Sequence, residues 1–266
     1  MYISQRSFEA VTRMFREVSG ISLNDTKRQL VISRLQRLAS ERGMDDLDAY
    51  VAGLERERDP DELVRVVDRL TTNETFFFRE IQHFDFLSAH LERSPPRGEF
   101  RVWSAASSSG EEAYSVAMLL ADQCTRAPWS VVGTDLSTQM VQHGKRALYT
   151  MDRARNLSPA RLKRHCLRGT GEYEGHVLVQ RQLRERVSFG GANLMRDLPR
   201  TLGSFDVIFL RNVLIYFDPP AKAAIVRRVL GQLKPDGLLY TGHAESLANL
   251  DVPVRSVATA VYAHAT

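Results

Sequence analysis

The sequence contains only two cysteines, Cys124 and Cys166, among its 266 residues. Two cysteines are too few for a disulfide framework or for a cysteine-rich metal site. The sequence also has no run that approaches the ~18 uninterrupted apolar residues of a membrane-spanning helix. Residues 205–217 come nearest, but Asp206 and Arg211 interrupt them. Because no apolar signal core follows the N-terminus either, we expect a soluble, cytoplasmic protein without direct membrane insertion.

A large charge of one sign is also absent, because the net charge is only +4. The basic residues are nevertheless clustered. Residues 27–42 contain five basic residues and one acid, and residues 152–186 contain nine basic residues and four acids. These clusters are either solvated faces or docking surfaces for an acidic partner. No recognised nucleic-acid module surrounds them, so we expect no nucleic-acid binding.

The first 80 residues predict a small helical unit. Apolar residues recur at helical spacing over residues 8–18, and Gly20 ends that segment. Residues 47–56 and 61–70 predict two further helices. Together with the helix described next, they form the expected N-terminal helical domain.

Another helix is expected to begin at Asn24 or Asp25, either of which can cap it. One side of this helix is apolar and consists of Val31, Ile32, Leu35, Leu38 and Ala39. Lys27, Arg34 and Arg37 lie on a neighbouring arc. The pattern therefore predicts one buried side and one cationic side.

After residue 99, predicted strands alternate with predicted helices. Strands are expected at residues 100–106, 130–134, 205–210 and 237–241, helices at 111–121, from 137 and at 219–233, and a final strand or hairpin arm at 254–263. This alternation indicates an α/β fold with a mostly parallel sheet that helices cover on both faces. Residues 167–189 are glycine-rich and then alternate in hydrophobicity, which predicts a small antiparallel insertion.

The turn after the first predicted strand is the expected ligand site. It reads Ser-Ser-Ser-Gly at residues 107–110, so the G-x-G-x-x-G fingerprint of a dinucleotide site is missing and an NAD-dependent oxidoreductase is disfavoured. Glu111 and Glu112 follow, and they either stabilise a helix N-terminus or attract a cationic ligand. Asp135 ends the next strand and either binds ribose hydroxyls or caps a helix. A positively charged adenosine derivative without phosphates, such as S-adenosylmethionine (SAM), fits this pattern.

Residues 71–80 contain three adjacent phenylalanines, which cannot all face one side of a helix. They either form a contact between the two domains or cover a ligand. Asn73, Thr75 and Arg79 are polar residues within this apolar segment, and buried polar groups need partners. Arg211 and Asn212 follow the strand at residues 205–210 and are expected at the same sheet edge as the turn.

Four segments together resemble the chemotaxis receptor glutamate methyltransferases of the CheR family. They are residues 71–80, 103–115 (WSAASSSGEEAYS), 205–217 (FDVIFLRNVLIYF) and 233–247 (LKPDGLLYTGHAESL). The resemblance implies a receptor-docking all-α domain at residues 1–80 and a class I, Rossmann-like methyltransferase domain at 81–266 with the small antiparallel β insertion. It also implies methyl transfer from SAM to glutamate side chains on the cytoplasmic helices of chemoreceptors, with S-adenosylhomocysteine as the product.

The resemblance also implies roles for single residues. The cofactor contacts are Asn73, Thr75, Arg79, Glu112, Asp135, Asn193, Leu194, Arg211 and Asn212. Arg79 and Tyr216 lie beside the transferred methyl group. Lys27, Arg34 and Arg37 dock the receptor helices, and Arg168, Gly169 and Gly171 belong to the insertion with which some members bind a receptor's C-terminal pentapeptide.

The chemistry that is implied requires little from the protein. A free glutamate has a pKa of ~4.3, so the acceptor is already an anion at neutral pH. We therefore expect neither a general base nor a metal, and nothing in the sequence requires more than a monomer. Two alternatives remain: a methyltransferase that acts on another acceptor, and a non-catalytic module that senses SAM.

Overall fold

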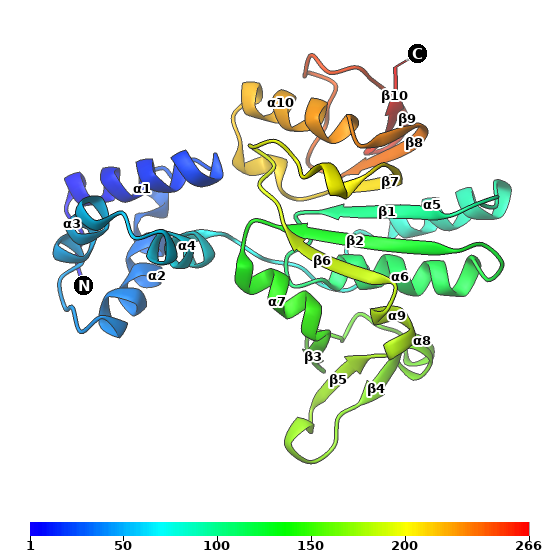
Figure 1. The fold of residues 1–266 in the computed structure, drawn as a ribbon, viewed down its shortest axis with the longest axis horizontal. Helices are drawn as coiled ribbons and strands as arrows, with labels where there is room; N and C mark the ends of the chain where they lie inside the picture. Colours follow the sequence, from blue (N-terminus) through cyan, green and yellow to red (C-terminus); the bar gives the residue numbers. More distant parts are fainter. Residues whose placement is uncertain (266) are drawn as a thin grey trace.

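The first 70 residues fold into a helical domain, which lies at the left of Figure 1. The computed structural model describes residues 1–265 of the chain. The elements of the helical domain are α1 (Gln5–Ser19), the 3₁₀ helix η1 (Asp25–Lys27), α2 (Arg28–Glu41), α3 (Leu47–Glu57) and α4 (Pro60–Leu70). Their apolar sides meet in a core that includes Phe8, Phe15, Leu35 and Tyr50. The predicted buried side of α2 is part of that core.

The start of α2 differs from the prediction. Asn24 and Lys27, the N-cap residues of η1 and α2, make no side-chain capping bond. Asn24 Oδ1 instead accepts a hydrogen bond of 2.6 Å from the hydroxyl group of Thr26. The chain therefore makes a 3₁₀ turn first, and α2 begins at Arg28.

A seven-stranded sheet lies at the centre of the second domain, with the strand order β6-β2-β1-β7-β8-β10-β9. The strands are β1 (Phe100–Ala105), β2 (Trp129–Asp135), β6 (Val187–Gly191), β7 (Phe205–Leu210), β8 (Leu233–Thr241), β9 (Val254–Ala258) and β10 (Val261–His264). The five neighbouring strands β6, β2, β1, β7 and β8 are parallel to one another, whereas β10 pairs antiparallel with β8 and β9. The carboxyl ends of β2, β1 and β7 therefore lie side by side.

Helices cover both faces of this sheet, as the alternating pattern predicts (Figure 1). They are α5 (Ile81–Arg93), α6 (Glu111–Gln123) and α7 (Thr138–Arg146) on one face and α10 (Pro219–Leu230) on the other. The sequence analysis did not predict α5. Leu233 was predicted in the last helix, but it begins β8. Within residues 1–265, no helix has the length and apolar character needed to cross a membrane.

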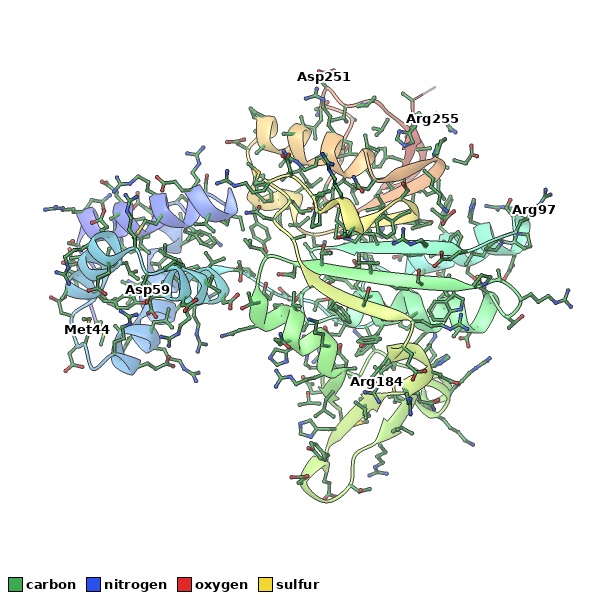
Figure 2. The ribbon with its side chains drawn as sticks, viewed as in Figure 1. Met44, Asp59, Arg97, Arg184, Asp251 and Arg255 are labelled. Atoms are coloured by element: carbon green, nitrogen blue, oxygen red, sulfur yellow. The ribbon has the colours of Figure 1, made fainter. Side chains whose placement is uncertain are left out.

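The antiparallel insertion exists, but its predicted range of 167–189 is wrong. The insertion contains a three-stranded sheet with the order β3-β5-β4. The elements of the insertion are β3 (Leu148–Thr150), α8 (Pro159–His165), β4 (Cys166–Arg168), η2 (Gly171–Tyr173) and β5 (His176–Val179). It lies below the main sheet, near Arg184 (Figure 2). Val187 and Phe189 belong instead to β6, which is parallel to β2. The alternation of apolar and polar residues in β6 resembles that in β5. The Phe189 ring, however, packs directly on Gly133 of β2, since an added Cβ at Gly133 would lie only 2.6 Å from the ring.

Polar contacts join the helical domain to the sheet domain. Asp68 of α4 accepts hydrogen bonds from the backbone N–H (2.9 Å) and the hydroxyl (2.8 Å) of Thr138, the first residue of α7. Asn193 Nδ2 donates to the carbonyl of Val18 at 2.6 Å. Gly20, with φ of 75°, ends α1 against Met195, since an added Cβ would lie 2.4 Å from Met195 Cγ. The carboxyl edge of the sheet therefore faces the helical domain.

Candidate functional site

A cleft of about 430 Å³ lies at the carboxyl ends of β1, β2 and β7. It is lined by the end of α1, by η1, by residues 70–75 and by the loops that follow the three strands. The predicted residues that line it are Lys27, Asn73, Thr75, Arg79, Glu112, Asp135, Asn193, Leu194, Arg211, Asn212 and Tyr216. The structure thus brings all nine predicted cofactor residues together with Tyr216.

The turn after β1 has an unusual backbone. Ala106 (φ 63°) and Ser108 (φ 50°) both adopt the left-handed region, which non-glycine residues rarely occupy. Gly110 has φ of 96°, and a Cβ there would lie 3.0 Å from the Cα of Gly144. The Ser107 hydroxyl is buried and has no hydrogen-bond partner among residues 1–265. Ser107 itself lines the cleft, but its hydroxyl oxygen is buried beside Gly133, where an added Cβ would lie 3.0 Å from it.

Asp135 is a buried carboxylate at the end of β2. Its Oδ2 accepts from the backbone N–H of Ser108 at 2.8 Å, and its Oδ1 accepts from that of Ser137 at 2.9 Å. Burial raises the pKa of Asp135 to about 6, although these two bonds favour the charged form. The sequence also allowed Asp135 to cap the following helix. The N-cap of α7 is Ser137 instead, because its Oγ accepts a hydrogen bond from the N–H of Met140. Asp135 therefore joins two loops and still lines the cleft.

Arg211 connects three parts of the cleft wall. Its side chain is 1% exposed, and it forms ion pairs with Glu80 Oε2 (3.1 Å) and Glu112 Oε2 (2.9 Å). It also donates to the carbonyl of Arg79. Burial raises the pKa of Glu112, whereas Arg211 and the Ser104 hydroxyl at 2.7 Å oppose that shift. Burial also acts on Glu80, but bonds from Asn212 and Arg211 hold its pKa below the usual value.

Glu245 fixes the loop after β7, a role that the sequence analysis did not assign. Its carboxylate accepts backbone N–H bonds from Asn212 (2.6 Å), Gly242 (2.8 Å) and Ile215 (3.2 Å). Asn212 is left-handed, with φ of 56°. Glu80 was missed as well, and its Oε1 accepts from Asn212 Nδ2 at 3.1 Å. Both glutamates lie within the segments that carry the family resemblance, but residue type alone gave no role to either.

The phenylalanine-rich segment forms one wall of the cleft. Phe77 and Phe78 are buried and pack on Tyr149 and Phe84, with ring centroids 5.0 and 4.9 Å apart, so these two form the contact with the sheet domain. Arg79 lines the cleft instead, and its Nη1 donates to the carbonyl of Glu74 at 2.8 Å.

Tyr216, at the end of η4 (Leu214–Tyr216), lies on the same cleft as Arg79. Burial raises the pKa of Tyr216, although a hydrogen bond with Thr72 opposes the shift. The hydroxyl therefore stays protonated at neutral pH and can donate a hydrogen bond to a ligand.

The predicted docking residues have different environments. Lys27 is exposed at the cleft, and Arg37 is exposed with Glu41 as its ion partner at 3.1 Å. Arg34 turns inward and donates to the carbonyls at residues 70 and 71, at 2.9 and 2.7 Å. It therefore caps the end of α4, which differs from the free cationic side chain that was expected. Arg168, Gly169 and Gly171 lie on the insertion and do not line the cleft.

Comparison with known families matches almost the whole chain. The model of the all-alpha domain of CheR methyltransferase matches residues 6–71, and that of the SAM-binding domain matches residues 73–263.

The chain belongs to the CheR methyltransferase family.

It is 41% identical to a chemotaxis protein methyltransferase of Salmonella typhimurium over 93% of this chain and 86% of that one. It is also 41% identical to a chemotaxis protein methyltransferase of Escherichia coli, over 94% and 87%. Chemotaxis protein methyltransferase 2 of Pseudomonas aeruginosa is 36% identical over 99% and 95%. This CheR protein is therefore a SAM-dependent methyltransferase with a helical domain and a Rossmann-like domain.

The cleft fits SAM by its own chemistry. It combines an unpartnered buried hydroxyl (Ser107), a buried carboxylate at a strand end (Asp135) and an acidic group (Glu112), but no phosphate-binding glycine motif. The two acidic groups suit a nucleoside with a cationic substituent. A pyrophosphate is repelled by the acidic first turn of α6.

Replacing Arg211 should show how much the buried ion pairs matter. We expect Arg211→Met to lower the free energy of unfolding by about 3 kcal/mol at pH 7, because two carboxylates lose their buried cation. The loss should be smaller at pH 5 than at pH 7, because burial raises the pKa of Glu112 and a lower pH favours its neutral form. Urea unfolding at both pH values measures this.

Arg227→Met is the matched control, because Arg227 pairs with the exposed Asp251, which Figure 2 labels at the surface. Exposed pairs contribute roughly 0–1 kcal/mol. Equal losses for the two variants at pH 7 would contradict a special role for the buried network.

Proposed function

We propose that this CheR protein methylates glutamate side chains on the cytoplasmic helices of chemoreceptors. The products are glutamate methyl esters and S-adenosylhomocysteine, and the enzyme acts in the cytoplasm as a monomer. The observation that carries the proposal is the continuity of the cleft, because the predicted cofactor residues and Lys27 of the helical domain line the same space. An acceptor that lies on the helical domain can therefore reach the cofactor.

The cofactor roles follow from the chemistry of each lining group. Asp135 accepts hydrogen bonds from ribose hydroxyls, and Asn193 with Leu194 lies beside the adenine. Glu112 attracts the cationic part of the ligand, while Arg211 and Asn212 hold that side of the cleft. Asn73, Thr75 and Arg79 cover the ligand from the segment that joins the two domains. When bound, SAM supplies a methyl group on a sulfonium, which leaves as a neutral thioether.

Arg79 and Tyr216 are the proposed catalytic residues. The acceptor carboxylate is already ionised, so the protein has to desolvate and align it. Among residues 1–265, the Arg79 guanidinium has no carboxylate partner, and its charge is available to an incoming glutamate. The Tyr216 hydroxyl can donate to one acceptor oxygen and orient the other. No residue needs to remove a proton.

The receptor surface is assigned to Lys27 and Arg37, because Arg34 is engaged with the end of α4. Glutamate-rich receptor helices are complementary to a cationic helix side, which speeds encounter. The insertion with Arg168, Gly169 and Gly171 is the candidate site for a receptor's C-terminal peptide. That role rests on the family resemblance alone.

The acceptor is tested by incubating the protein with methyl-labelled SAM and membranes that contain chemoreceptors. We expect label on the receptor that mild base releases as methanol, because carboxyl methyl esters hydrolyse readily. Receptors whose methylated glutamates are replaced by alanine are the control. Base-stable label would identify another acceptor, and cofactor binding without any label would favour a sensing module.

Cofactor binding should weaken as the pH falls through about 6. The raised pKa of Asp135 means that its carboxylate is charged above that pH and neutral below it. A neutral carboxyl accepts ribose hydrogen bonds less well, so SAM affinity should fall by up to tenfold per pH unit below 6. Calorimetric titration from pH 5 to 8 measures this.

Asp135→Asn separates the contribution of Asp135 to the pH dependence from that of Glu112, because burial also raises the pKa of Glu112. The variant should bind SAM roughly tenfold more weakly at pH 8, the cost of one charged hydrogen bond, and show a flatter pH profile. Asp197→Asn, at an exposed position, is the control. A pH profile in Asp135→Asn as steep as in the wild type would refute the assignment.

The docking surface is tested by a matched pair of charge reversals. Arg37 and Arg13 are both exposed, and each pairs with a glutamate at 3.1 Å. We expect Arg37→Glu to raise the KM for receptor roughly fivefold, the order of one exposed charge interaction, and to leave SAM affinity unchanged. Arg13→Glu should change neither. The difference should shrink at high salt, and equal KM values for the two variants would move the docking surface elsewhere.

A further inference from the structure

A second buried carboxylate lies directly behind the cofactor turn. Glu111 is 0% exposed and is the first residue of α6, immediately after the turn at residues 107–110. Burial raises its pKa, and Arg153 is the first of the groups that oppose the shift. Arg153 Nε donates to Glu111 Oε1 at 2.6 Å, and Arg153 Nη2 forms an ion pair with the same oxygen. Within residues 1–265, Arg153 is the one cation that forms a salt bridge with Glu111.

Arg153 also contacts the turn itself. Its Nη2 donates to Ser109 Oγ at 2.7 Å, and the Ser109 hydroxyl donates to Glu111 Oε2 at 2.7 Å. Tyr149 of β3 adds a third contact, because its hydroxyl donates to the Ser109 carbonyl at 2.8 Å. Ser109 is therefore held on both its side chain and its backbone.

These contacts originate outside the main sheet. Tyr149 belongs to β3, and Arg153 lies between β3 and α8, within the antiparallel insertion. The neighbouring turn residues Ser107 and Ser108 line the cleft, and Ser108 N–H donates to Asp135. One side of the turn thus faces the cofactor cleft, while Arg153 holds the other side.

We propose that Arg153 is a positioning residue for the cofactor. It neutralises Glu111 and fixes Ser109, so that Ser108 keeps its left-handed backbone and its bond to Asp135. Without the arginine, Glu111 has to take up a proton, admit water or move, because an unpaired buried charge is strongly unfavourable. Entry of water or movement of Glu111 displaces the turn, whereas a neutral side chain at this position needs no cation. The inference rests on the proposed placement of the ribose beside Asp135 and does not depend on the identity of the acceptor.

Arg153→Met tests this in the full chain, with S-adenosylhomocysteine as the calorimetric probe. We expect the Kd to rise about tenfold, while circular dichroism and the thermal midpoint confirm a folded protein. The matched control is Arg155→Met, because Arg155 is 68% exposed and pairs outward with Asp152 at 3.1 Å. Its Kd should equal that of the wild type. A lower thermal midpoint with an unchanged Kd for Arg153→Met would show a merely structural role and overturn the proposal.

Two further variants separate charge from packing. The double variant Arg153→Met with Glu111→Gln should bind the probe more tightly than Arg153→Met alone, because a neutral amide needs no cation. Arg153→Lys should recover part of the affinity by restoring the charge without the guanidinium geometry. A double variant as weak as the product of the two single effects would refute the proposal. Since no receptor is present, failure here is distinct from failure of the acceptor assignment.

Discussion

The cofactor cleft depends on one buried cation, the guanidinium of Arg211 between Glu80 and Glu112. The three side chains come from the end of β7, the segment that joins the domains and the first turn of α6, so the ion pairs fix three independent pieces of backbone in one arrangement. Such a network adds little net stability relative to an apolar core, but breaking it is costly. Its main contribution is geometric, since Glu80 and Asn212 both keep left-handed backbones beside it.

The same logic explains how the site discriminates among nucleosides. Two consecutive glutamates begin α6, and each has its own arginine: Arg153 pairs with Glu111 and Arg211 pairs with Glu112. Burial raises the pKa of both glutamates and the two arginines oppose that shift, so the start of α6 presents paired acids where a phosphate site would present bare N–H groups. A dinucleotide site presents the opposite arrangement, with glycines and a bare helix N-terminus. The preference for a cationic, phosphate-free nucleoside is thus contained in how these buried charges are paired.

Local sequence patterns predicted the helices and strands whose formation depends on neighbouring residues, but they could not predict contacts between residues far apart in the chain. Helical periodicity located α1 to α4, and the carboxyl-edge rule brought Asp135, Arg211 and Asn212 to one cleft. The strand β6 was misassigned because alternation is identical in any half-buried strand, whereas its parallel pairing with β2 and the packing of Phe189 on Gly133 and Gly144 are contacts across the chain. Arg34 looked like a surface cation because its partners, two backbone carbonyls, leave no trace in the sequence. Glu245 was missed because its partners are backbone N–H groups, and Glu80 because its partners, Arg211 and Asn212, are far away in the sequence.

Because the proposed acceptor carboxylate needs no base, its selection has to come from access and charge, and access is set by how the two domains are held. Asp68 of the helical domain accepts two hydrogen bonds from Thr138 at the start of α7, and Asn193 of the sheet domain donates to Val18 at the end of α1. These contacts fix the position of Lys27 relative to Arg79 and Tyr216 across the cleft. In the proposed docking, a carboxylate on a receptor helix has to lie in register along α2 to reach the methyl donor. On that proposal, specificity for the acceptor resides in the junction between the domains, and the sheet domain supplies the reaction centre.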